Sequence, residues 1–241
     1  MASLGKLSAI ATEPRAWRAL GLGVAATMEH AAALGRHDFA TVIDVGANKG
    51  QFAAFAMRTW PRAKLVCFEP LPGPRATLAR VTAGHATLFD CALGAEDGVA
   101  DIHVASRDDS SSMLEMNALQ KDLFGMTEAG ALKVPVRRLD ACLETLAWEK
   151  PALLKIDVQG FELQVLAGAA ATLARIDAAY IELSFVELYK GQALADDVLA
   201  VTRAHGLALA GVFNQTEGPG GAPIQADFLF TRSRARAEPA G

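Results

Sequence analysis

A glycine-containing run, Asp44-Val45-Gly46-Ala47-Asn48-Lys49-Gly50, follows a β-branched segment and precedes a segment with helical spacing. Gly46 and Gly50 allow the backbone to turn tightly and approach a ligand, and the following helix offers its N-terminal amides. Glu69 ends the next β-branched segment, about 20 residues after the turn, where a carboxylate can hold ribose hydroxyls. The two features together predict a site for a nucleotide-type ligand.

A second group of acidic residues follows later apolar segments. Asp157 comes directly after the run Leu153 to Ile156, Glu162 follows five residues later, and Glu182 lies in the next β-branched segment. Because ligands of open α/β sheets bind outside the carboxyl ends of the strands, Asp157 should face a reaction centre. Asp157 and Glu182 could bind Mg²⁺, orient an acceptor hydroxyl or accept its proton. Glu162 could equally cap a helix, and Glu182 could anchor a loop.

The elements around these residues alternate between strand and helix. Short β-branched or apolar runs predict strands at 41–45, 64–69, 86–91, 151–157, 178–184, 207–213 and 226–232. Helical spacing predicts helices at 51–60, 75–81, 161–176 and 193–206. This alternation is typical of a parallel sheet with right-handed crossovers. The last two strands have no helix between them, so we expect them to be antiparallel.

The chain divides into a leader, one domain and a tail. Residues 1–40 are predicted to form a mostly helical leader packed on the domain, which covers 41–232, and 233–241 form a polar tail. Residues 107–133 interrupt the alternation between expected strands at 100–106 and 132–140, and we expect this insertion to cover the ligand edge of the sheet. Its polar and apolar side chains predict contacts with an acceptor, from Ser110, Ser111, Ser112, Met113, Met116, Phe124 and Met126.

Composition limits the class of protein. The chain has 241 residues, of which 51% are hydrophobic, and a formal charge of -4, which disfavours nucleic acid as a partner. No run reaches the roughly 20 apolar residues that a membrane-spanning helix needs. The three cysteines have no metal-type spacing, which favours a reducing cytoplasm. We therefore expect a small-molecule or glycan acceptor as partner, and an oligomer is compatible with the sequence.

The type of nucleotide ligand follows from what the sequence lacks. The turn has the spacing G-x-N-x-G and not the G-x-G-x-x-G of dinucleotide-binding folds. Neither Tyr180 nor Tyr189 is followed four residues later by a lysine, as short-chain dehydrogenases require. An antiparallel strand pair at the C-terminus also fits a methyltransferase sheet better. These points favour S-adenosylmethionine, with a nucleotide-dependent oxidoreductase or an inactive module that binds the methyl donor as alternatives.

The order of motifs resembles the FkbM family of S-adenosylmethionine-dependent methyltransferases. The resemblance covers about residues 41–232 and rests on VIDVGANKGQF, CFEPLP, CALG, VRRLD, LLKIDVQGFELQVLAGA and YIELS. It implies a Rossmann-like class I methyltransferase fold, with a mostly parallel seven-stranded sheet and an antiparallel C-terminal strand. It also implies O-methylation of a hydroxyl on a sugar, glycan or secondary metabolite. Gln159 stands where the family more often has glutamate.

The resemblance also implies roles for particular residues. Asp44 would lie near the ammonium group of the methyl donor and Glu69 would hold its ribose. The implied cofactor-binding residues are Asp44, Gly46, Ala47, Asn48, Gly50, Gln51, Phe52, Glu69, Pro70, Asp90, Cys91 and Ala92. A hydroxyl is too weak an acid to ionise alone at neutral pH, so a base or a metal ion is expected.

The sequence ranks three acids for that role. Asp157 is the first choice as base or metal ligand, Glu182 the second and Glu162 the third, with Mg²⁺ the candidate metal for Asp157 and Glu182. The histidines are predicted to serve structural roles: His30 and His37 in the leader, His85 and His103 in peripheral segments, and His205 at a helix end, where it would complement the dipole.

Overall fold

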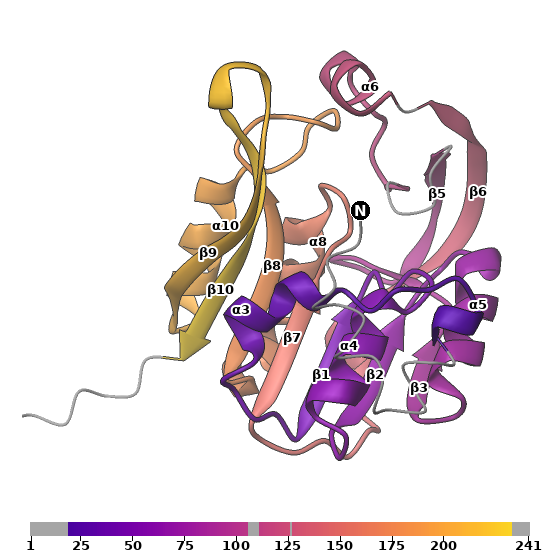
Figure 1. Cartoon of the computed structure of the whole chain (residues 1–241), viewed down its shortest axis with the longest axis vertical. Coiled ribbons are helices and arrows are strands. Elements are labelled where there is room, and N and C mark those ends of the chain that lie inside the picture. Colours follow the sequence, from indigo (N-terminus) through magenta and orange to yellow (C-terminus); the bar gives the residue numbers. More distant parts are fainter. Residues whose placement is uncertain (1–18, 106–110, 126, 233–241) are drawn as a thin grey trace, which may run out of the picture.

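The computed structural model describes residues 19–105, 111–125 and 127–232. Seven strands form its main sheet in the order β3-β2-β1-β7-β8-β10-β9 (Figure 1). Their bounds are β1 Thr41–Val45, β2 Lys64–Phe68, β3 Ala86–Phe89, β7 Ala152–Ile156, β8 Ala178–Ser184, β9 Leu207–Glu217 and β10 Pro223–Arg232. Within the described residues, β10 pairs antiparallel with both β8 and β9, and the other strand pairs of this sheet are parallel. The predicted fold class, a mostly parallel seven-stranded sheet with an antiparallel C-terminal strand, is confirmed.

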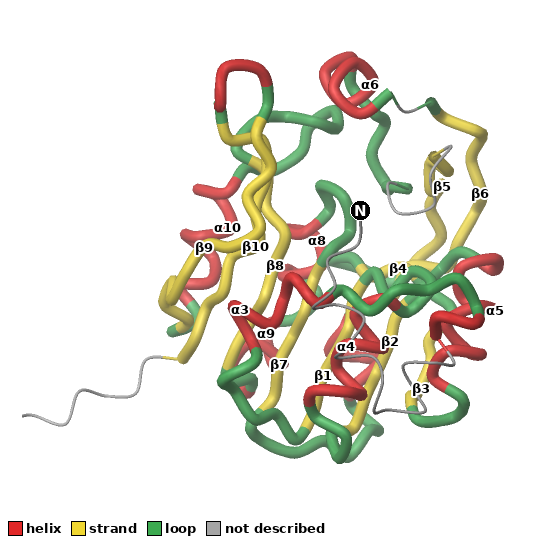
Figure 2. Tube along the Cα trace, viewed as in Figure 1, coloured by secondary structure: helices red, strands yellow, loops and turns green. Residues whose placement is uncertain are grey.

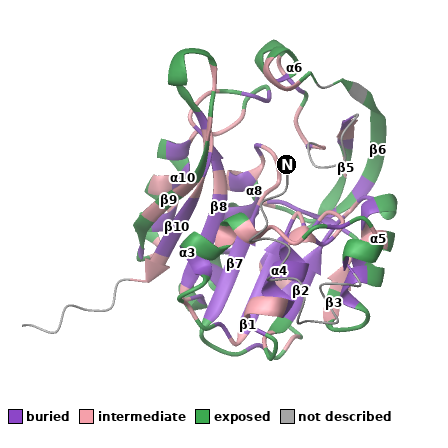
Figure 3. Cartoon of the chain, in the orientation of Figure 1, coloured by how far each residue is buried: buried purple, intermediate pink, exposed green. Residues whose placement is uncertain are grey.

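Helices cover both faces of this sheet (Figure 2). On one face lie η1 Met28–His30, α3 Ala31–Leu34, α4 Gln51–Thr59 and α5 Pro72–Thr82, whose apolar side chains share a core cluster with Val42 of β1. On the other face lie α7 Leu139–Leu143, α8 Glu162–Ala167, α9 Ala170–Arg175 and α10 Ala195–Ala204, which pack with Ile43 of the same strand. Successive residues of a strand point to opposite faces, so β1 contributes to both clusters and is buried throughout (Figure 3).

The register of the parallel strands aligns their carboxyl ends. Val45 lies opposite Phe68 of β2 and Ile156 of β7, and Ile156 lies opposite Ile181 of β8. The residues that come next along each strand are therefore neighbours at one edge of the sheet. These are Gly46, Glu69, Asp157 and Glu182.

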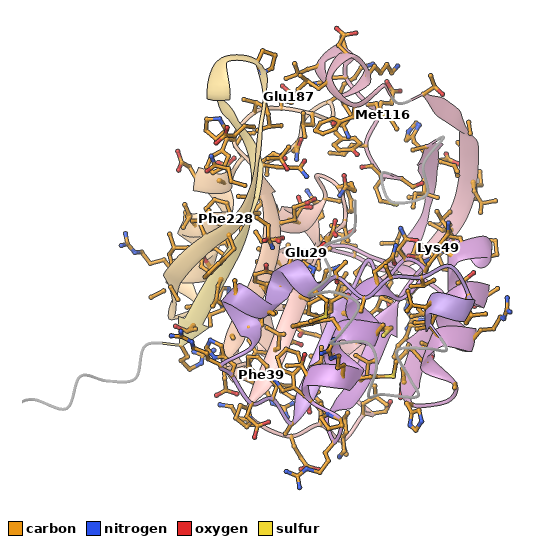
Figure 4. All side chains as sticks on the ribbon, viewed as in Figure 1. Glu29, Phe39, Lys49, Met116, Glu187 and Phe228 are labelled. Atoms are coloured by element: carbon orange, nitrogen blue, oxygen red, sulfur yellow. The ribbon has the colours of Figure 1, made fainter. Side chains whose placement is uncertain are left out.

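A second, smaller sheet lies at this edge, and the insertion connects two of its strands. Strands β4 Ala92–Leu93, β5 Gly98–Ala105 and β6 Glu128–Arg137 form it, and α6 Ala118–Phe124 lies beside the loop that follows β8 (Figure 1). The backbone N–H of Asn117 donates to Leu188 O, and Met116 packs against Leu188 and Tyr189. Figure 4 shows Met116 and Glu187 on the two sides of this contact. The described part of the insertion therefore contacts the loop that follows β8.

Two expected elements are divided in the structure. The helix predicted over 161–176 is two helices, α8 and α9, because the chain at Gly168 passes close to Gly94: a Cβ on Gly168 would lie 2.1 Å from Gly94 O. The strand predicted over 86–91 ends at Phe89, and Ala92 and Leu93 pair with the second sheet instead.

The described part of the leader is less helical than predicted. Between residues 23 and 27 the chain is extended or turning, and Gly23 has a φ of +74°, which a helix cannot contain. The segment still packs on the domain, because Val24 and Leu34 are buried in the cluster that contains α4. The rest of the leader, the polar tail, Ser110 and Met126 lie outside the described residues.

Candidate active site

A cavity of about 240 Å³ opens at the carboxyl ends of β1, β2 and β7, whereas the next cavity measures about 50 Å³. The larger cavity lies where ligands of open α/β sheets bind. Many of its lining residues are predicted site residues: Gly46, Ala47, Asn48, Gln51, Phe52, Glu69, Pro70, Cys91, Ala92, Ser111, Ser112, Met113 and Asp157. The motifs therefore converge in space.

The other predicted site residues lie outside the lining. Asp44 is fully buried beneath the turn, and Gly50 precedes α4 in a left-handed conformation. Asp90 is exposed next to Cys91. Glu162 and Glu182 are buried or half-buried behind the lining residues. Contact of any of these residues with a ligand stays a prediction.

The glycine turn is held tightly between three strands. The backbone N–H groups of Gly46 and Ala47 both donate to Phe68 O, at 3.1 and 3.0 Å. Gly46 has a φ of +77°, and a Cβ there would lie 1.9 Å from the backbone oxygen of Asp157. Only glycine fits between the turn and the end of β7. The structure thereby brings the first predicted motif against the second.

Glu69 lies at the end of β2 and contacts the turn directly. Its Oε2 accepts the backbone N–H of Asn48 and its Oε1 that of Leu71, both at 2.8 Å. Burial raises the pKa of Glu69 to about 7, although the two backbone hydrogen bonds oppose the shift. Each carboxylate oxygen keeps a second lone pair for a ligand hydroxyl. This geometry fits the predicted role of Glu69.

Lys155 forms the charged floor of the cavity. Its ammonium lies 3.3 Å from Asp44 Oδ1 and 3.5 Å from Asp157 Oδ2, and it donates to Gly46 O at 3.3 Å. Burial alone would lower its pKa, but the two carboxylates outweigh burial and raise it, so Lys155 stays charged. Burial raises the pKa of Asp44, and Lys155 offsets only part of that shift.

Gln159 connects the two acids that the sequence singled out. Its Nε2 donates to Asp157 Oδ1 and to Glu182 Oε2, both at 2.8 Å, and its Oε1 accepts the Tyr189 hydroxyl at 2.9 Å. Gln225 donates to the other oxygen of Glu182 at 2.9 Å. Both hydrogens of the Gln159 amide are thus used to hold the two carboxylates at the edge of the sheet.

The buried acids behind the cavity have raised pKa values. Burial raises the pKa of Glu162 to about 7, and this carboxylate accepts the backbone N–H of Gly160 at 3.0 Å, so it stabilises the turn before α8. Burial, followed by repulsion from Asp157, raises the pKa of Glu182. Only Asp157 among the three candidate bases lines the cavity.

The insertion residues line the cavity with their hydroxyls already engaged. Ser112 donates to the backbone oxygen of Gln159 at 2.6 Å, and the Ser111 hydroxyl accepts the backbone N–H of Ala105 at 3.2 Å. Met113 packs on the apolar side of the second sheet. The Ser112 contact ties the insertion to the end of β7, and recognition of an acceptor by these three residues stays a prediction.

Several lining residues were not predicted from sequence patterns. They are Thr27, His30, Val45, Phe68, Leu71, Leu93, Ile102, Lys155, Val158, Gln159 and Phe161. Lys155 and Gln159 belong to the motif around Asp157, so that motif could have indicated them. No local pattern distinguishes Thr27 or His30, because their approach to the cavity depends on how the leader folds back on the sheet.

Two buried oxygen atoms of lining residues lack partners. Thr27 Oγ1 and Asn48 Oδ1 make no hydrogen bond within the described residues. Buried polar atoms are almost always paired, so these oxygens suit a ligand that carries hydrogen-bond donors. The ammonium and ribose hydroxyls of S-adenosylmethionine are such groups, and the residues around the turn fit this molecule.

The same region does not fit Mg²⁺. Within the described ranges, no three acidic, histidine or cysteine residues lie close enough together to hold a metal ion. The Gln159 amide nitrogen lies between Asp157 and Glu182 and donates a hydrogen bond to each. A cation shared by the two carboxylates would need that same position. A metal role for this pair therefore has no support in the donor set.

The strand order, the single antiparallel strand, the tight glycine turn and the acid at the end of β2 define a class I methyltransferase domain, the class that uses S-adenosylmethionine. A family model, the methyltransferase FkbM domain, matches residues 44–207. The chain belongs to the FkbM methyltransferase family, as its motifs predict.

Two curated relatives are similar over part of their length. The 2-O-methyltransferase NoeI of Sinorhizobium fredii is 31% identical over 161 residues, which cover 63% of this chain and 66% of the relative. Methyltransferase 1 of Beauveria bassiana is 28% identical over 148 residues, which cover 54% of this chain and 59% of the relative. The chain thus spans about three fifths to two thirds of the length of these relatives.

Among solved structures, the chain aligns with fibrillarin from Aeropyrum pernix, which contains natively bound S-adenosyl-L-methionine. The TM-score is 0.48 and the identity 12%, over 89% of this chain and 76% of that one.

No helix within the described ranges is long and apolar enough to cross a membrane.

Proposed function

We propose that this protein is an S-adenosylmethionine-dependent O-methyltransferase that acts on a hydroxyl of a sugar, glycan or secondary metabolite. The observation that carries the proposal is the cavity itself. Glu69 lines the cavity beside the glycine turn. The oxygens Thr27 Oγ1 and Asn48 Oδ1 belong to lining residues and have no hydrogen-bond partner within the described residues. The name of the relative from Sinorhizobium fredii supports a hydroxyl oxygen as the acceptor atom.

The walls of the cavity divide into regions that match the parts of S-adenosylmethionine. Glu69 would hold the ribose hydroxyls, and the turn from Gly46 to Asn48 would hold the methionine part. Cys91 and Ala92, both buried and lining the cavity, would contact the base. When bound, S-adenosylmethionine supplies a methyl group on a positively charged sulfur atom.

Asp157 is the group best placed to orient the acceptor. Its side chain is 35% exposed, so it is open to the cavity, and Lys155 and Gln159 hold its two oxygens from the protein side. A carboxylate fixed in this way can accept a hydrogen bond from an acceptor hydroxyl and align its oxygen for attack. That Asp157 also accepts the proton stays a prediction from the sequence.

The shape of the site favours a small hydroxylated acceptor. Ile102 and Met113 provide apolar surface, and Asp157 provides a carboxylate, in the lining of the same cavity. A molecule with a polar reacting end and an apolar or weakly polar body matches this division. Many secondary metabolites have such a division.

Binding of the methyl donor is tested by calorimetric titration with S-adenosylmethionine, S-adenosylhomocysteine and NAD. We expect both sulfur compounds to bind and NAD not to bind. Glu69→Gln should weaken binding of S-adenosylhomocysteine, whereas Glu149→Gln, which changes an exposed ion pair with Lys64, should not. Binding of NAD alone would favour an oxidoreductase and would refute the proposal.

Transfer to oxygen is tested with S-adenosylmethionine labelled in the methyl group and a panel of methyl glycosides and phenolic alcohols. We expect label in an ether product, located by mass spectrometry. Tight binding of S-adenosylhomocysteine without transfer to any member of the panel would favour a module that binds the methyl donor without catalysis.

A further inference from the structure

The histidine of the leader, His30, lies in the wall of the cavity. It ends the short helix η1, lines the cavity together with Phe52 and Asp157, and its side chain is 12% exposed. Its ring packs edge-on against Phe52 and Tyr180, with centroids 5.3 and 5.4 Å away. The aromatic packing fixes the plane of the imidazole.

One nitrogen of His30 is bound to a buried polar cluster. Nδ1 lies 3.1 Å from the Tyr180 hydroxyl and 3.5 Å from Asp227 Oδ2. The Tyr180 hydroxyl donates its hydrogen to Asp227 at 2.9 Å, and the Asn214 amide donates to Asp227 at 2.7 Å and to Tyr180 at 3.2 Å. Tyr180 and Asp227 therefore present only acceptor atoms to His30.

This arrangement determines which nitrogen of His30 carries the hydrogen. A neutral imidazole has one N–H and one lone pair, and Nδ1 must be the N–H because both of its partners accept. The lone pair is then on Nε2, which makes no hydrogen bond within the described residues, and the ring that carries it lines the cavity. His30 thus presents a basic nitrogen away from the cluster.

Asp227 keeps its negative charge in this cluster. Burial would raise its pKa, but hydrogen bonds from His30, Asn214 and Tyr180 outweigh burial and lower it. A carboxylate beside Nδ1 stabilises an imidazolium and holds the ring in one tautomer. His30 and Asp227 come from the two ends of the described chain, and only the folded sheet brings them together.

We propose that His30 is the general base of the methyl transfer, with Asp227 as its positioning residue. This inference rests on the proposed function and names the group that accepts the proton. Nε2 takes the proton from the acceptor hydroxyl as the new oxygen–carbon bond forms and the sulfur–carbon bond breaks. The imidazolium then releases the proton to water, and the products are the methyl ether and S-adenosylhomocysteine.

His30 is better suited to this step than Asp157. A general base works best when it can gain a proton near the operating pH, which an imidazole does and an ordinary carboxylate does not. Asp157 also has the Lys155 ammonium at 3.5 Å and the Gln159 amide at 2.8 Å, so each of its two oxygens already has a partner. Asp157 would align the hydroxyl while His30 accepts its proton.

The first experiment needs neither methyl donor nor acceptor. Long-range ¹H–¹⁵N spectra of the ¹⁵N-labelled protein distinguish the two neutral tautomers of histidine, and the His30 signals are assigned by their loss in His30→Asn. We expect the hydrogen of the neutral ring on Nδ1. A hydrogen on Nε2 would leave no lone pair on that nitrogen and would overturn the proposal.

The second experiment separates the two nitrogens by substitution. In His30→Asn, the side-chain amide keeps a donor near the place of Nδ1 and removes the lone pair of Nε2. We expect kcat to fall by about 10²- to 10⁴-fold, the usual contribution of a general base. S-adenosylhomocysteine affinity should change little. The matched control is His37→Asn, since His37 stacks on Phe39 and does not line the cavity.

Added imidazole provides a further test in His30→Ala, where it should fill the space left by the ring and restore part of kcat. Wild-type activity in His30→Asn, or loss of S-adenosylhomocysteine binding with the fold intact, would overturn the role of His30 as base. Absence of transfer by the wild-type protein would instead refute the proposed function. The two failures are therefore distinguishable.

Discussion

Replacement of Gly46 by alanine is expected to disrupt the site from its centre. The new Cβ would lie 1.9 Å from the Asp157 backbone oxygen, whereas ordinary contacts begin at 3.4 Å, so the end of β7 must retreat by about 1.5 Å. That movement would break the hydrogen bond from the Asp157 N–H to Val45 O, now 3.1 Å long. It would also carry the Asp157 side chain out of place.

The magnitude follows from two contributions. A left-handed backbone conformation costs an alanine about 1–2 kcal/mol. Forcing a methyl group into a packed region costs about 1–3 kcal/mol more. We therefore expect Gly46→Ala to lower the free energy of unfolding by about 2–5 kcal/mol, and to abolish detectable binding of S-adenosylhomocysteine even where the fold persists.

The assay is urea denaturation combined with calorimetric titration of S-adenosylhomocysteine. Gly98→Ala is the matched control, because no atom lies within 4 Å of a Cβ there and its φ is not positive. The control should unfold within about 0.5 kcal/mol of the wild type. If Gly46→Ala matched this control in both measurements, the turn would not be packed against β7 as described.

Four further predictions concern charged and polar groups. Because burial raises the pKa of Glu69 to about 7, affinity for S-adenosylhomocysteine should rise about 30-fold from pH 5.5 to pH 8, and Glu69→Gln should remove this dependence. The raised pKa also means that the folded state holds this proton more tightly, so Glu69 contributes a loss of stability as pH rises from 4.5 to about 7, measurable by urea denaturation. Lys155→Met should lower the free energy of unfolding by about 3–5 kcal/mol, since it leaves Asp44 buried and unpaired, and Asp44→Asn in the same chain should recover part of the loss. Gln159→Leu should lower kcat more than S-adenosylhomocysteine affinity, because the amide holds the two acids at the acceptor end; equal losses in both would contradict this.

Most of the fold was predictable because its signals are local. The β-branched run at 41–45, the turn at Gly46 and the helical spacing after it are contiguous, so each element could be read from neighbouring residues. The division of the helix predicted over 161–176 was not predictable, because it depends on the approach of Gly168 to Gly94, which lies far from Gly168 in the sequence.

The site was predictable where its residues directly follow strands. Residues that follow strands, such as Glu69 and Asp157, lie in the cavity because parallel strands bring their carboxyl ends to one edge. Gln159 appeared only as a departure from a family pattern, yet it holds both acids. Its role requires the side chain to reach across to β8, which no local pattern shows.

The sequence by itself determined the class of this protein, since the order of its motifs specifies the sheet, the glycine turn and the family. The tertiary structure alone decided which polar groups face one another. His30 belongs to a segment whose local pattern suggests only a helix, and Asp227 lies in the last strand. Their contact arises because β10 inserts antiparallel beside β8 and the leader folds over that edge. Long-range packing sets such pairs, and packing is not encoded in the spacing of neighbouring residues.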